Sequence, residues 1–363
     1  MKSHIFSFFS GAGFLDLGFE KQGFQIVYVN EIDKDFLNAY KYSRKKLNVK
    51  EPIYGYFQGS ITELLKNKGL QDFQKLLKNS KKSGALVGFI GGPPCPDFSV
   101  AGKNKGKNGE NGKLSKSYVD LIVKTKPDFF LFENVKGLYR TTRHREFFEQ
   151  LKSLLAKNGY YLSERLINSI EYGAPQDRER IILLGFNKQV FSDPMPESFW
   201  KKYVKYESKS VFALPWPDTN KQNSISSKPS GIIEELTTNY WFSKNNVKNH
   251  PNQRHVFTPR AALPKFKVIP EGDVSKKSFK RLHNHRYSPT AAYGNNEVHI
   301  HPRLPRRITV AEALAIQSLP KAFELPENMS LTSMFKTIGN GVPFEAAYGI
   351  AKMLKGFIRS QLP

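Results

Sequence analysis

Short apolar strands that alternate with amphipathic segments are the feature of this sequence that most restricts its fold. Five stretches of strand length occur in the first half, at residues 5–9, 25–29, 85–90, 129–132 and 180–186. Segments with helical periodicity lie between them, at residues 33–47, 61–77, 117–125 and 145–157. Strands separated by helices indicate an α/β fold, with a doubly wound, mostly parallel sheet and helices on both faces.

This alternation ends after residue 186. Residues 187–304 are rich in Pro, Asn, Ser, Lys and aromatic residues and have no sustained periodicity, which predicts a second, smaller lobe that is irregular and β-rich. Helical patterns return at residues 306–319, where Thr309 is suited to cap a helix, and at 342–358, where Pro343 suits a first turn. We therefore expect a first lobe at 1–186, a second at 187–304, and a segment at 305–363 that returns to the first.

Charge and cysteine content restrict the partners of this chain. It carries 56 Lys and Arg against 32 Asp and Glu, a formal net charge of +24, which predicts a polyanionic partner such as nucleic acid. The alternative is the lysine preference of a low-GC genome, which adds charge without a partner. One cysteine excludes an internal disulfide and suits a reducing cytoplasm, and no stretch approaches the length of a membrane span. The histidines lack the usual ligand spacing, so we expect no metal.

The single cysteine, Cys95, lies in Gly91-Gly92-Pro93-Pro94-Cys95, directly after an apolar run that reads as a buried strand. The two prolines fix the backbone at the end of this strand and so present the next side chain in one orientation. A thiol held there can act as a nucleophile if a neighbouring cation or helix terminus stabilises the thiolate. The alternative is a small buried apolar residue. The prolines and the polar segment downstream favour the nucleophile.

A glycine-containing turn, Phe9-Ser10-Gly11-Ala12-Gly13, follows the first strand and opens a helix. Such a turn lets the backbone approach a ligand closely, and the helix N-terminus favours an anionic group. Glu31 ends the second strand about 20 residues later, where doubly wound folds bind a ribose hydroxyl pair. Helix capping by Asn30 or Asp33 is an alternative that can coexist with this role. Together the two signals predict an adenosine-containing cofactor.

Glu133 ends another buried strand, so its carboxylate is either desolvated for acid–base work or is a structural partner. Arg178 and Arg180 precede the strand at 181–186, and their period-2 spacing places both on one face. Paired guanidinium groups can hold a base edge, a phosphate or a carboxylate such as Glu133. Each of these residues, taken alone, is more often part of a structural ion pair.

Taken together, the motifs resemble those of the cytosine-5 DNA methyltransferase family, of the bacterial restriction–modification type, in the family's order over nearly the whole chain. They are Phe9-Ser10-Gly11-Ala12-Gly13, Pro93-Pro94-Cys95, Glu133-Asn134-Val135, Gln176-x-Arg178-x-Arg180, Arg306-Arg307-Ile308-Thr309 and Gly339-Asn340-Gly341-Val342-Pro343. Two positions depart from the family pattern. Pro96 stands where many members carry Gln, and Ser60 stands where an Asp commonly contacts adenine.

The resemblance implies the fold of S-adenosylmethionine-dependent methyltransferases, with S-adenosyl-L-methionine as cofactor. Cys95 would add to carbon 6 of a flipped-out cytosine, and Glu133, Arg178 and Arg180 would stabilise the base. Adenine would lie between Phe9 and Ile32, and Glu31 would bind the ribose hydroxyls. The other residues implied at the cofactor site are Gly11, Ala12, Gly13, Phe14, Ser60, Ile61, Gly92, Pro94, Leu114, Asn340 and Val342.

The resemblance also places a target-recognition domain at residues 187–304 and a mobile loop after Cys95, on which Ser99 and Lys103 would contact DNA. The best candidates for reading bases are Arg281, His285, Arg286, Tyr287 and Thr290, although contacts to phosphate alone are nearly as well supported.

The expected partner is double-stranded DNA, bound by a monomer in the bacterial cytoplasm. A restriction endonuclease would share the recognition sequence without stable binding. The alternatives are a tRNA cytosine-5 methyltransferase of the same architecture and a catalytically silent DNA-binding module. The long basic segment favours DNA over tRNA, and the intact Cys95, Glu133 and arginine pair argue against the silent module.

Overall fold

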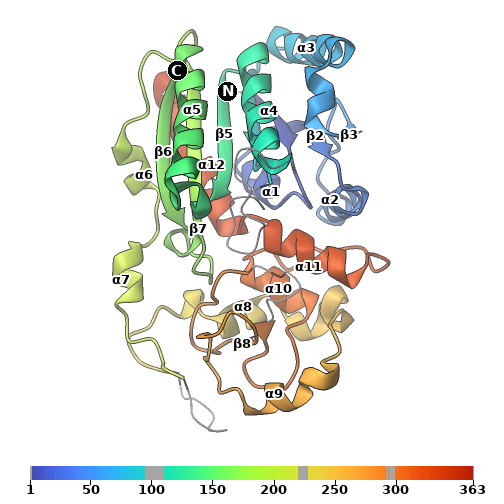
Figure 1. The fold of residues 1–363 in the computed structure, drawn as a ribbon, viewed down its shortest axis with the longest axis vertical. Helices are drawn as coiled ribbons and strands as arrows, with labels where there is room; N and C mark the ends of the chain where they lie inside the picture. Colours follow the sequence, from blue (N-terminus) through green and yellow to red (C-terminus); the bar gives the residue numbers. More distant parts are fainter. Residues whose placement is uncertain (1, 95–109, 220–227, 292, 294–298, 363) are drawn as a thin grey trace.

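The computed structural model describes residues 2–94, 110–219, 228–291, 293 and 299–362. Its centre is a seven-stranded sheet with the order β3-β2-β1-β4-β5-β7-β6 (Figure 1). The strands are β1 (Ser3–Phe8), β2 (Gln25–Glu31), β3 (Tyr56–Gln58), β4 (Leu86–Gly91), β5 (Phe129–Val135), β6 (Tyr160–Asn168) and β7 (Glu179–Asn187). All neighbouring strands pair in parallel except β7, which is antiparallel to both β5 and β6. The predicted doubly wound, mostly parallel sheet is confirmed.

Helices cover both faces of the sheet. One face packs against α1 (Phe14–Lys21), α2 (Lys34–Lys46) and α12 (Phe344–Gln361). The other packs against α3 (Asn67–Lys82), α4 (Glu110–Thr125) and α5 (Thr142–Lys157). Central strands such as β5 are almost wholly buried, which explains their continuous apolar runs. The short helix α6 (Glu197–Lys202) also joins the first core, because Trp200 packs there.

The sequence does not reveal three of the elements. β3 has three residues and β6 lies at the sheet edge with a half-buried, polar pattern, so neither shows a clear apolar run. The third is α11 (Leu331–Asn340). The predicted cap of α10 (Val310–Ile316) is confirmed, since Thr309 and Glu312 form a capping box. Pro343 stands just before the first turn of α12, as its N-cap.

The second lobe is irregular, as expected, but the described residues do not make it β-rich. Its strands there are β8 (Lys280–Arg281) and β9 (His299–Ile300). Its other regular elements are α7 (Ser208–Phe212), α8 (Thr238–Lys244), α9 (Leu263–Val268) and short 3₁₀ turns. Side chains supply hydrogen bonds that a sheet would otherwise provide. Asn245 donates to the Leu319 carbonyl (2.8 Å) and Asn252 to the Leu325 carbonyl (2.9 Å).

A third hydrophobic cluster joins the two lobes. It contains Phe14 of α1 and Phe36 of α2, together with residues of α8, α10 and α11. Phe14 packs edge-on against Phe323, with ring centroids 5.1 Å apart. None of the helices in the described part of the chain is long and apolar enough to cross a membrane.

Candidate active site

The candidate site lies where the strand order reverses. β1 has β2 on one side and β4 on the other, and doubly wound folds bind ligands beyond the carboxyl ends of the strands at such a point. Phe9 follows β1, Glu31 ends β2, Gly92 follows β4 and Glu133 is near the end of β5. Because β7 is reversed, its beginning, with Arg180, reaches the same edge. The topology therefore brings five predicted site residues of the described part of the chain to the same end of the sheet.

Glu31 is held by the turn that follows β1. Its Oε2 accepts a hydrogen bond from the Gly11 N–H (2.8 Å) and its Oε1 accepts from the Asp33 N–H (2.9 Å). Burial raises the pKa of Glu31, and these backbone hydrogen bonds oppose that rise. Helix capping belongs to Asp33, whose carboxylate accepts from the Asp35 and Phe36 N–H groups. Of the two candidates for capping, Asn30 and Asp33, the structure therefore selects Asp33, and the Glu31 carboxylate is not used as a cap.

Two apolar residues follow the strands at this end of the sheet, Phe9 after β1 and Ile32 after β2. Phe9 has a left-handed backbone, φ 53°, which is uncommon for a non-glycine residue and often marks a functional turn. Its ring meets Tyr118 edge-on, with centroids 6.1 Å apart. Ile32 is 65% exposed, although it directly follows a buried strand. An exposed isoleucine, a half-buried phenylalanine and a fixed carboxylate are suited to bind the adenine and ribose of an adenosine-containing cofactor.

The glycine turn rests on a buried ionic network that sequence reasoning missed. Gly13 has φ 80°, and a Cβ there would lie 2.5 Å from the Tyr40 ring and 2.6 Å from Arg44. Arg44 donates to the Gly13 carbonyl (2.6 Å) and pairs with Glu20 (2.9 Å). The Tyr40 hydroxyl donates to Asp16 (3.0 Å). The available signal was the i, i+4 spacing of Tyr40 and Arg44, which places an arginine on the buried face of α2.

Several residues implied at the cofactor site have side chains that do not face a ligand crevice. The side chains of Ala12, Phe14, Ile61 and Val342 are buried in hydrophobic clusters, so only their backbone groups could contact a cofactor. Ser60 forms a capping box with Glu63. The remaining implied residues are partly buried Leu114 and Gly92 and exposed Pro94 and Asn340.

We call the end of the sheet where the parallel strands finish and β7 begins the catalytic edge. Glu133 lies at its centre. Its Oε1 pairs with Arg180 Nε at 3.0 Å. Arg180 faces Val135 in the register, two positions from the residue opposite Glu133, so the two side chains meet diagonally across β5 and β7. Burial raises the pKa of Glu133, and the charges of Arg180 and Arg178 oppose the rise. A carboxyl group poised in this way can either donate or accept a hydrogen bond.

Arg178 has a different environment from Arg180. Its side chain is 1% exposed, and it donates to the Ala291 carbonyl (2.8 Å) and to the Gly339 carbonyl (2.8 Å). Burial and the neighbouring Arg180 lower the pKa of its guanidinium. Gln176 accepts from Arg178 (3.4 Å) and from the Ala291 N–H (3.0 Å). Arg178 therefore links the second lobe to the end of α11, and its two nearest acceptors are backbone carbonyls.

The segment that precedes Cys95 is hydrogen-bonded to β5. The side-chain amide of Asn134 donates through Nδ2 to the Pro93 carbonyl (3.3 Å) and accepts through Oδ1 from the Val135 N–H (2.8 Å). Glu133 and Asn134 are adjacent on β5, so this strand places the Glu133 carboxylate and also holds the Pro93 backbone. Cys95, Ser99 and Lys103 lie outside the described residues.

Of the candidate base-reading residues, Arg281 is least available to DNA. Its guanidinium donates to the carbonyls of His301 (3.0 Å), Pro302 (3.2 Å), Leu304 (3.4 Å) and Phe266, and it is 5% exposed. This arrangement does not support the base-reading role that we expected for it. The carbonyls of an irregular lobe need donors, and a buried arginine provides them.

The other candidates lie beside the catalytic edge. Residues 286–290 are next to Pro175–Asp177, since the Ser288 N–H donates to the Pro175 carbonyl (2.8 Å). Half-buried Arg286 lies over the Tyr287 ring (5.3 Å) and donates to the Pro217 carbonyl at 3.3 Å. Tyr287 packs on Trp216, Thr290 donates to the Asp177 carbonyl (2.7 Å), and His285 is half-buried. Arg286 is therefore the arginine better placed to reach DNA.

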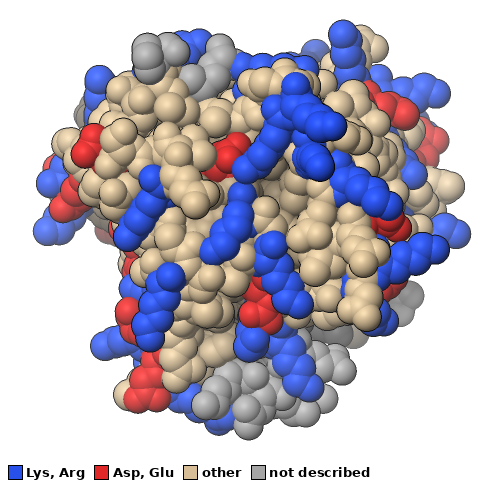
Figure 2. Space-filling model, turned by 90° about the horizontal axis from the view of Figure 1, so that it is seen from above, with Lys and Arg blue, Asp and Glu red and all other residues tan. Residues whose placement is uncertain are grey.

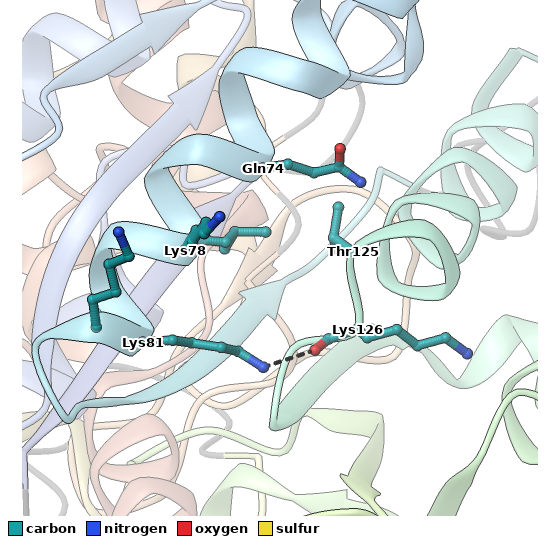
Figure 3. Close-up of a pocket in the computed structure, with 7 residues that line it drawn as sticks. Gln74, Lys78, Lys81, Thr125 and Lys126 are labelled. Carbon is teal, nitrogen blue, oxygen red and sulfur yellow. Dashed lines mark hydrogen bonds between the residues drawn. The ribbon is translucent and has the colours of Figure 1, made fainter.

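A basic groove of about 510 Å³ lies at the other edge of the sheet, between α3 and the end of α4 (Figure 3). It is lined by Gln74, Leu77, Lys78, Lys81, Lys82, Thr125 and Lys126. None of the predicted catalytic or cofactor residues lines it, so it is separate from the candidate active site.

Comparison with known proteins agrees with this geometry. The profile of the family described as C-5 cytosine-specific DNA methylase matches residues 3–356. The chain is 61% identical to the Type II methyltransferase M.NmeDI of Neisseria meningitidis serogroup C, over 99% of this chain and 85% of that protein. It is 33% identical to the Type II methyltransferase M.FnuDI of Fusobacterium nucleatum, over 97% and 94% of the two chains.

A crystal structure of a prophage-encoded protein of E. coli has the same fold. Its TM-score is 0.64 at 22% sequence identity, and the match covers 99% of this chain and 100% of that one.

Proposed function

Because the chain belongs to the family of C-5 cytosine-specific DNA methylases, we propose that its Cys95 attacks carbon 6 of a cytosine flipped out of duplex DNA. The protein is a DNA cytosine-5 methyltransferase of the Type II restriction–modification kind that uses S-adenosylmethionine. The covalent adduct, the flipped base and the residue roles below are the proposal.

The chemistry requires an activated ring carbon. Addition of the Cys95 thiolate to carbon 6 makes carbon 5 enamine-like and nucleophilic. S-adenosylmethionine, when bound, supplies an electrophilic methyl group. After methylation, carbon 5 loses its proton, the ring double bond re-forms and the thiolate leaves from carbon 6. A cytosine inside a stacked duplex exposes neither carbon to these groups, so it must be flipped out at a cost of a few kcal/mol.

The observation that carries this proposal is the buried Glu133–Arg180 pair. Negative charge develops at ring nitrogen 3 when the thiolate adds, and a protonated Glu133 would stabilise it by donating a hydrogen bond. Burial raises the pKa of Glu133, which favours a protonated carboxyl group, while the charges of Arg180 and Arg178 oppose that rise. Arg180, 3.0 Å from Glu133, would orient the carboxyl group and hold the carbonyl oxygen of the base. Arg178 would act as a positioning residue, through the carbonyls of Ala291 and Gly339.

The cofactor would be bound at the switch point of the sheet. Glu31 would accept hydrogen bonds from the ribose hydroxyls, and Phe9 and Ile32 would contact the adenine. Gly11 and the first turn of α1 would lie next to the anionic end. The exposure of Ile32 and the left-handed Phe9 support this assignment. Ser60 is engaged in a capping box through its side chain and its backbone N–H, which donates to Glu63 (3.0 Å), so its place in the structure does not support a contact with adenine.

Recognition of the DNA sequence would belong to residues 187–304, and the enzyme would act as a monomer. Arg286 and Tyr287 support this role, because they lie next to Pro175–Asp177 at the catalytic edge. A restriction endonuclease of the host would then read the same sequence independently.

Radiolabelled methyl transfer tests the covalent step. We expect Cys95→Ser to lose methyl transfer and to keep most DNA binding, because a serine oxygen is far less nucleophilic at neutral pH but fills the same space. Wild-type enzyme should also form a denaturation-resistant adduct with DNA that contains 5-fluorocytosine, since fluorine cannot leave as a proton does. Appreciable transfer by Cys95→Ser, or active enzyme without an adduct, would contradict the mechanism. Methylation of tRNA in preference to duplex DNA would contradict the assignment of DNA as the substrate.

A further inference from the structure

Lysines occur at the amino-terminal edge of the sheet, opposite the candidate active site. Lys2 precedes β1, Lys82 ends α3 before β4, Lys126 precedes β5, Lys188 follows β7 and Lys157 ends α5 before β6. These five strands are neighbours in the order β1-β4-β5-β7-β6, so the lysines follow one another along the edge. We call these five residues the lysine row. Figure 2 views this end of the molecule from above and shows Lys and Arg side chains scattered over the face, with fewer acidic side chains among them.

The backbone under the row is cross-linked. The Leu86 N–H donates to the Lys2 carbonyl (3.0 Å) and the Asp128 N–H to the Val87 carbonyl (2.8 Å). The Asn187 N–H donates to the Asp128 carbonyl (2.9 Å) and the Lys188 N–H to the Gly159 carbonyl (2.9 Å). Hydrogen bonds therefore join the loops from one end of the row to the other, and the lysines are attached to a rigid base.

The carboxylate nearest to Lys126 in the sequence does not neutralise the row. Asp128 is buried, accepts from the Val87 N–H (2.7 Å) and pairs with Lys81 at 2.8 Å. Lys81 and Lys78 extend the basic surface into the groove of Figure 3. Lys126 is held by the carbonyl oxygen of Asn158 at 2.6 Å. The Asp128 carboxylate is therefore already paired with Lys81 and does not neutralise Lys126.

Helix dipoles explain only part of this row. Cations at helix C-termini are stabilising, and Lys82 and Lys157 end α3 and α5. Lys2 and Lys188 adjoin strands and do not end helices, so the dipole gives no reason for them. Exposed like charges in a row repel one another, and a polyanion bound across them would remove that repulsion.

The dimensions fit a nucleic-acid backbone. Five neighbouring strands span four spacings of about 4.8 Å, or about 19 Å in all. Duplex DNA carries one phosphate charge per about 1.7 Å of its axis, so about eleven phosphates occupy the same length. β5 alone, with seven residues, separates the two edges by about 20 Å, so a straight duplex at the catalytic edge does not reach the row.

We propose that the lysine row binds the phosphate backbone of a second DNA segment, outside the catalytic edge. The binding is independent of sequence, because it contacts only phosphates. It goes beyond the proposed function, which needs one duplex.

Lysine acetylation footprinting locates this contact on the full-length protein. The probe is a duplex of A·T pairs only, which contains no cytosine to methylate. We expect the duplex at low salt to slow acetylation of Lys82, Lys157 and Lys188 by about threefold or more, and high salt to restore it. Lys75, exposed in the middle of α3, is the internal control and should react at an unchanged rate. Equal acetylation of the row lysines with and without duplex would overturn the proposal.

A capture assay tests whether the row binds a second segment. Enzyme is loaded on an immobilised duplex, and capture of a fluorescent second duplex is measured. The Lys82→Gln/Lys157→Gln variant should capture at least about fivefold less than wild type. Lys45→Gln/Lys75→Gln removes the same charge from two other exposed helical lysines and should capture normally. Both variants should methylate a single duplex at the wild-type rate. If the row variant has a lower melting temperature but captures normally, the lysines serve only the helix termini and the proposal fails.

Discussion

Gly92 and Glu133 are in such close contact that a Cβ on residue 92 would lie 2.6 Å from Oε2 of Glu133. The glycine is therefore required by the carboxyl group across the sheet. Gly92→Ala should push Glu133 away from its position beside Arg180 and lower the methylation rate by about tenfold or more, as for a misplaced general acid. Steady-state methyl transfer measures this effect.

Gly84→Ala is the matched control for that substitution. Gly84 has φ 74° and open space around it, at the opposite edge of the sheet. The alanine should cost about 1 kcal/mol of stability through backbone strain and leave the methylation rate of the folded enzyme unchanged. If both alanine variants lose activity to the same extent, the contact with Glu133 is not the cause.

Arg178→Lys should weaken cofactor binding as well as the fold. A lysine ammonium cannot reproduce the two-sided contact of the guanidinium with the Ala291 and Gly339 carbonyls. Gly339 directly precedes Asn340, so release of this carbonyl should loosen the end of α11. Calorimetric titration with S-adenosylmethionine and thermal unfolding measure the two effects. Arg165→Lys is the control, because Arg165 contacts Glu171 and the Trp200 carbonyl in another part of the sheet. Wild-type cofactor affinity in Arg178→Lys would refute the link.

Arg281→Ala and Arg286→Ala should have different effects. Removal of Arg281 takes away the donor of the Phe266, His301 and Pro302 carbonyls and should cost of order 3 kcal/mol of stability. If Arg286 contacts a base edge, its removal should cost about 1–3 kcal/mol of discrimination between cognate and mismatched duplexes. Chemical denaturation and competitive methylation rates separate these outcomes. An Arg286→Ala enzyme with wild-type discrimination would mean that Arg286 contacts phosphate only.

The second lobe should be sensitive to acid through His299. Burial lowers the pKa of His299 to about 3, against an ordinary value near 6.5. Between these values the unfolded chain binds a proton that the folded protein excludes, so stability falls as the pH is lowered from about 6.5 toward 3. At pH 5 the loss relative to pH 8 should be about 2 kcal/mol. Urea unfolding at both pH values measures it.

His299→Gln provides the test of that assignment. The variant should lose the contribution of His299, about 2 kcal/mol, whereas half-buried His301, whose pKa burial lowers to about 4, keeps a contribution of its own. Half-buried His255→Gln should leave the pH dependence unchanged. An unchanged difference between pH 5 and pH 8 in His299→Gln would assign the acid sensitivity to other groups.

Strong local patterns predicted the fold of the first lobe. Continuous apolar runs marked β1, β4 and β5 because those strands are covered on both faces. β6 was not recognised, since an edge strand with a half-buried pattern carries a weaker signal. The expectation of a β-rich second lobe failed for a related reason. Its aromatic and proline-rich composition is compatible with either strands or short helical turns, and long-range side-chain hydrogen bonds select between them.

The candidate site was predictable at the ends of strands and less so elsewhere. Glu31, Glu133 and Arg180 follow from their positions in the strand pattern, because parallel strands bring their carboxyl ends together. Phe14 and Ile61 were also expected at the cofactor site, but their side chains lie in the core. Spacing alone does not tell which way a turn residue points. Arg281 and Arg286 are similar in sequence context, and only packing distinguishes the buried carbonyl donor from the more accessible side chain.

Because β7 runs antiparallel to β5, Arg180 and the segment that follows Asn187 lie at opposite ends of the same strand. Its first residues deliver Arg180 to Glu133, whereas its last residue, Asn187, leaves the sheet at the far edge. The long segment that follows thus departs from the side remote from the reacting groups and has to travel around the molecule before it meets them. On the proposal that this segment reads the DNA, an insertion, deletion or exchange within it would alter what the enzyme recognises without shifting the strand that aligns the arginine. Evolution can therefore change the target sequence of such a protein while keeping its reaction centre intact.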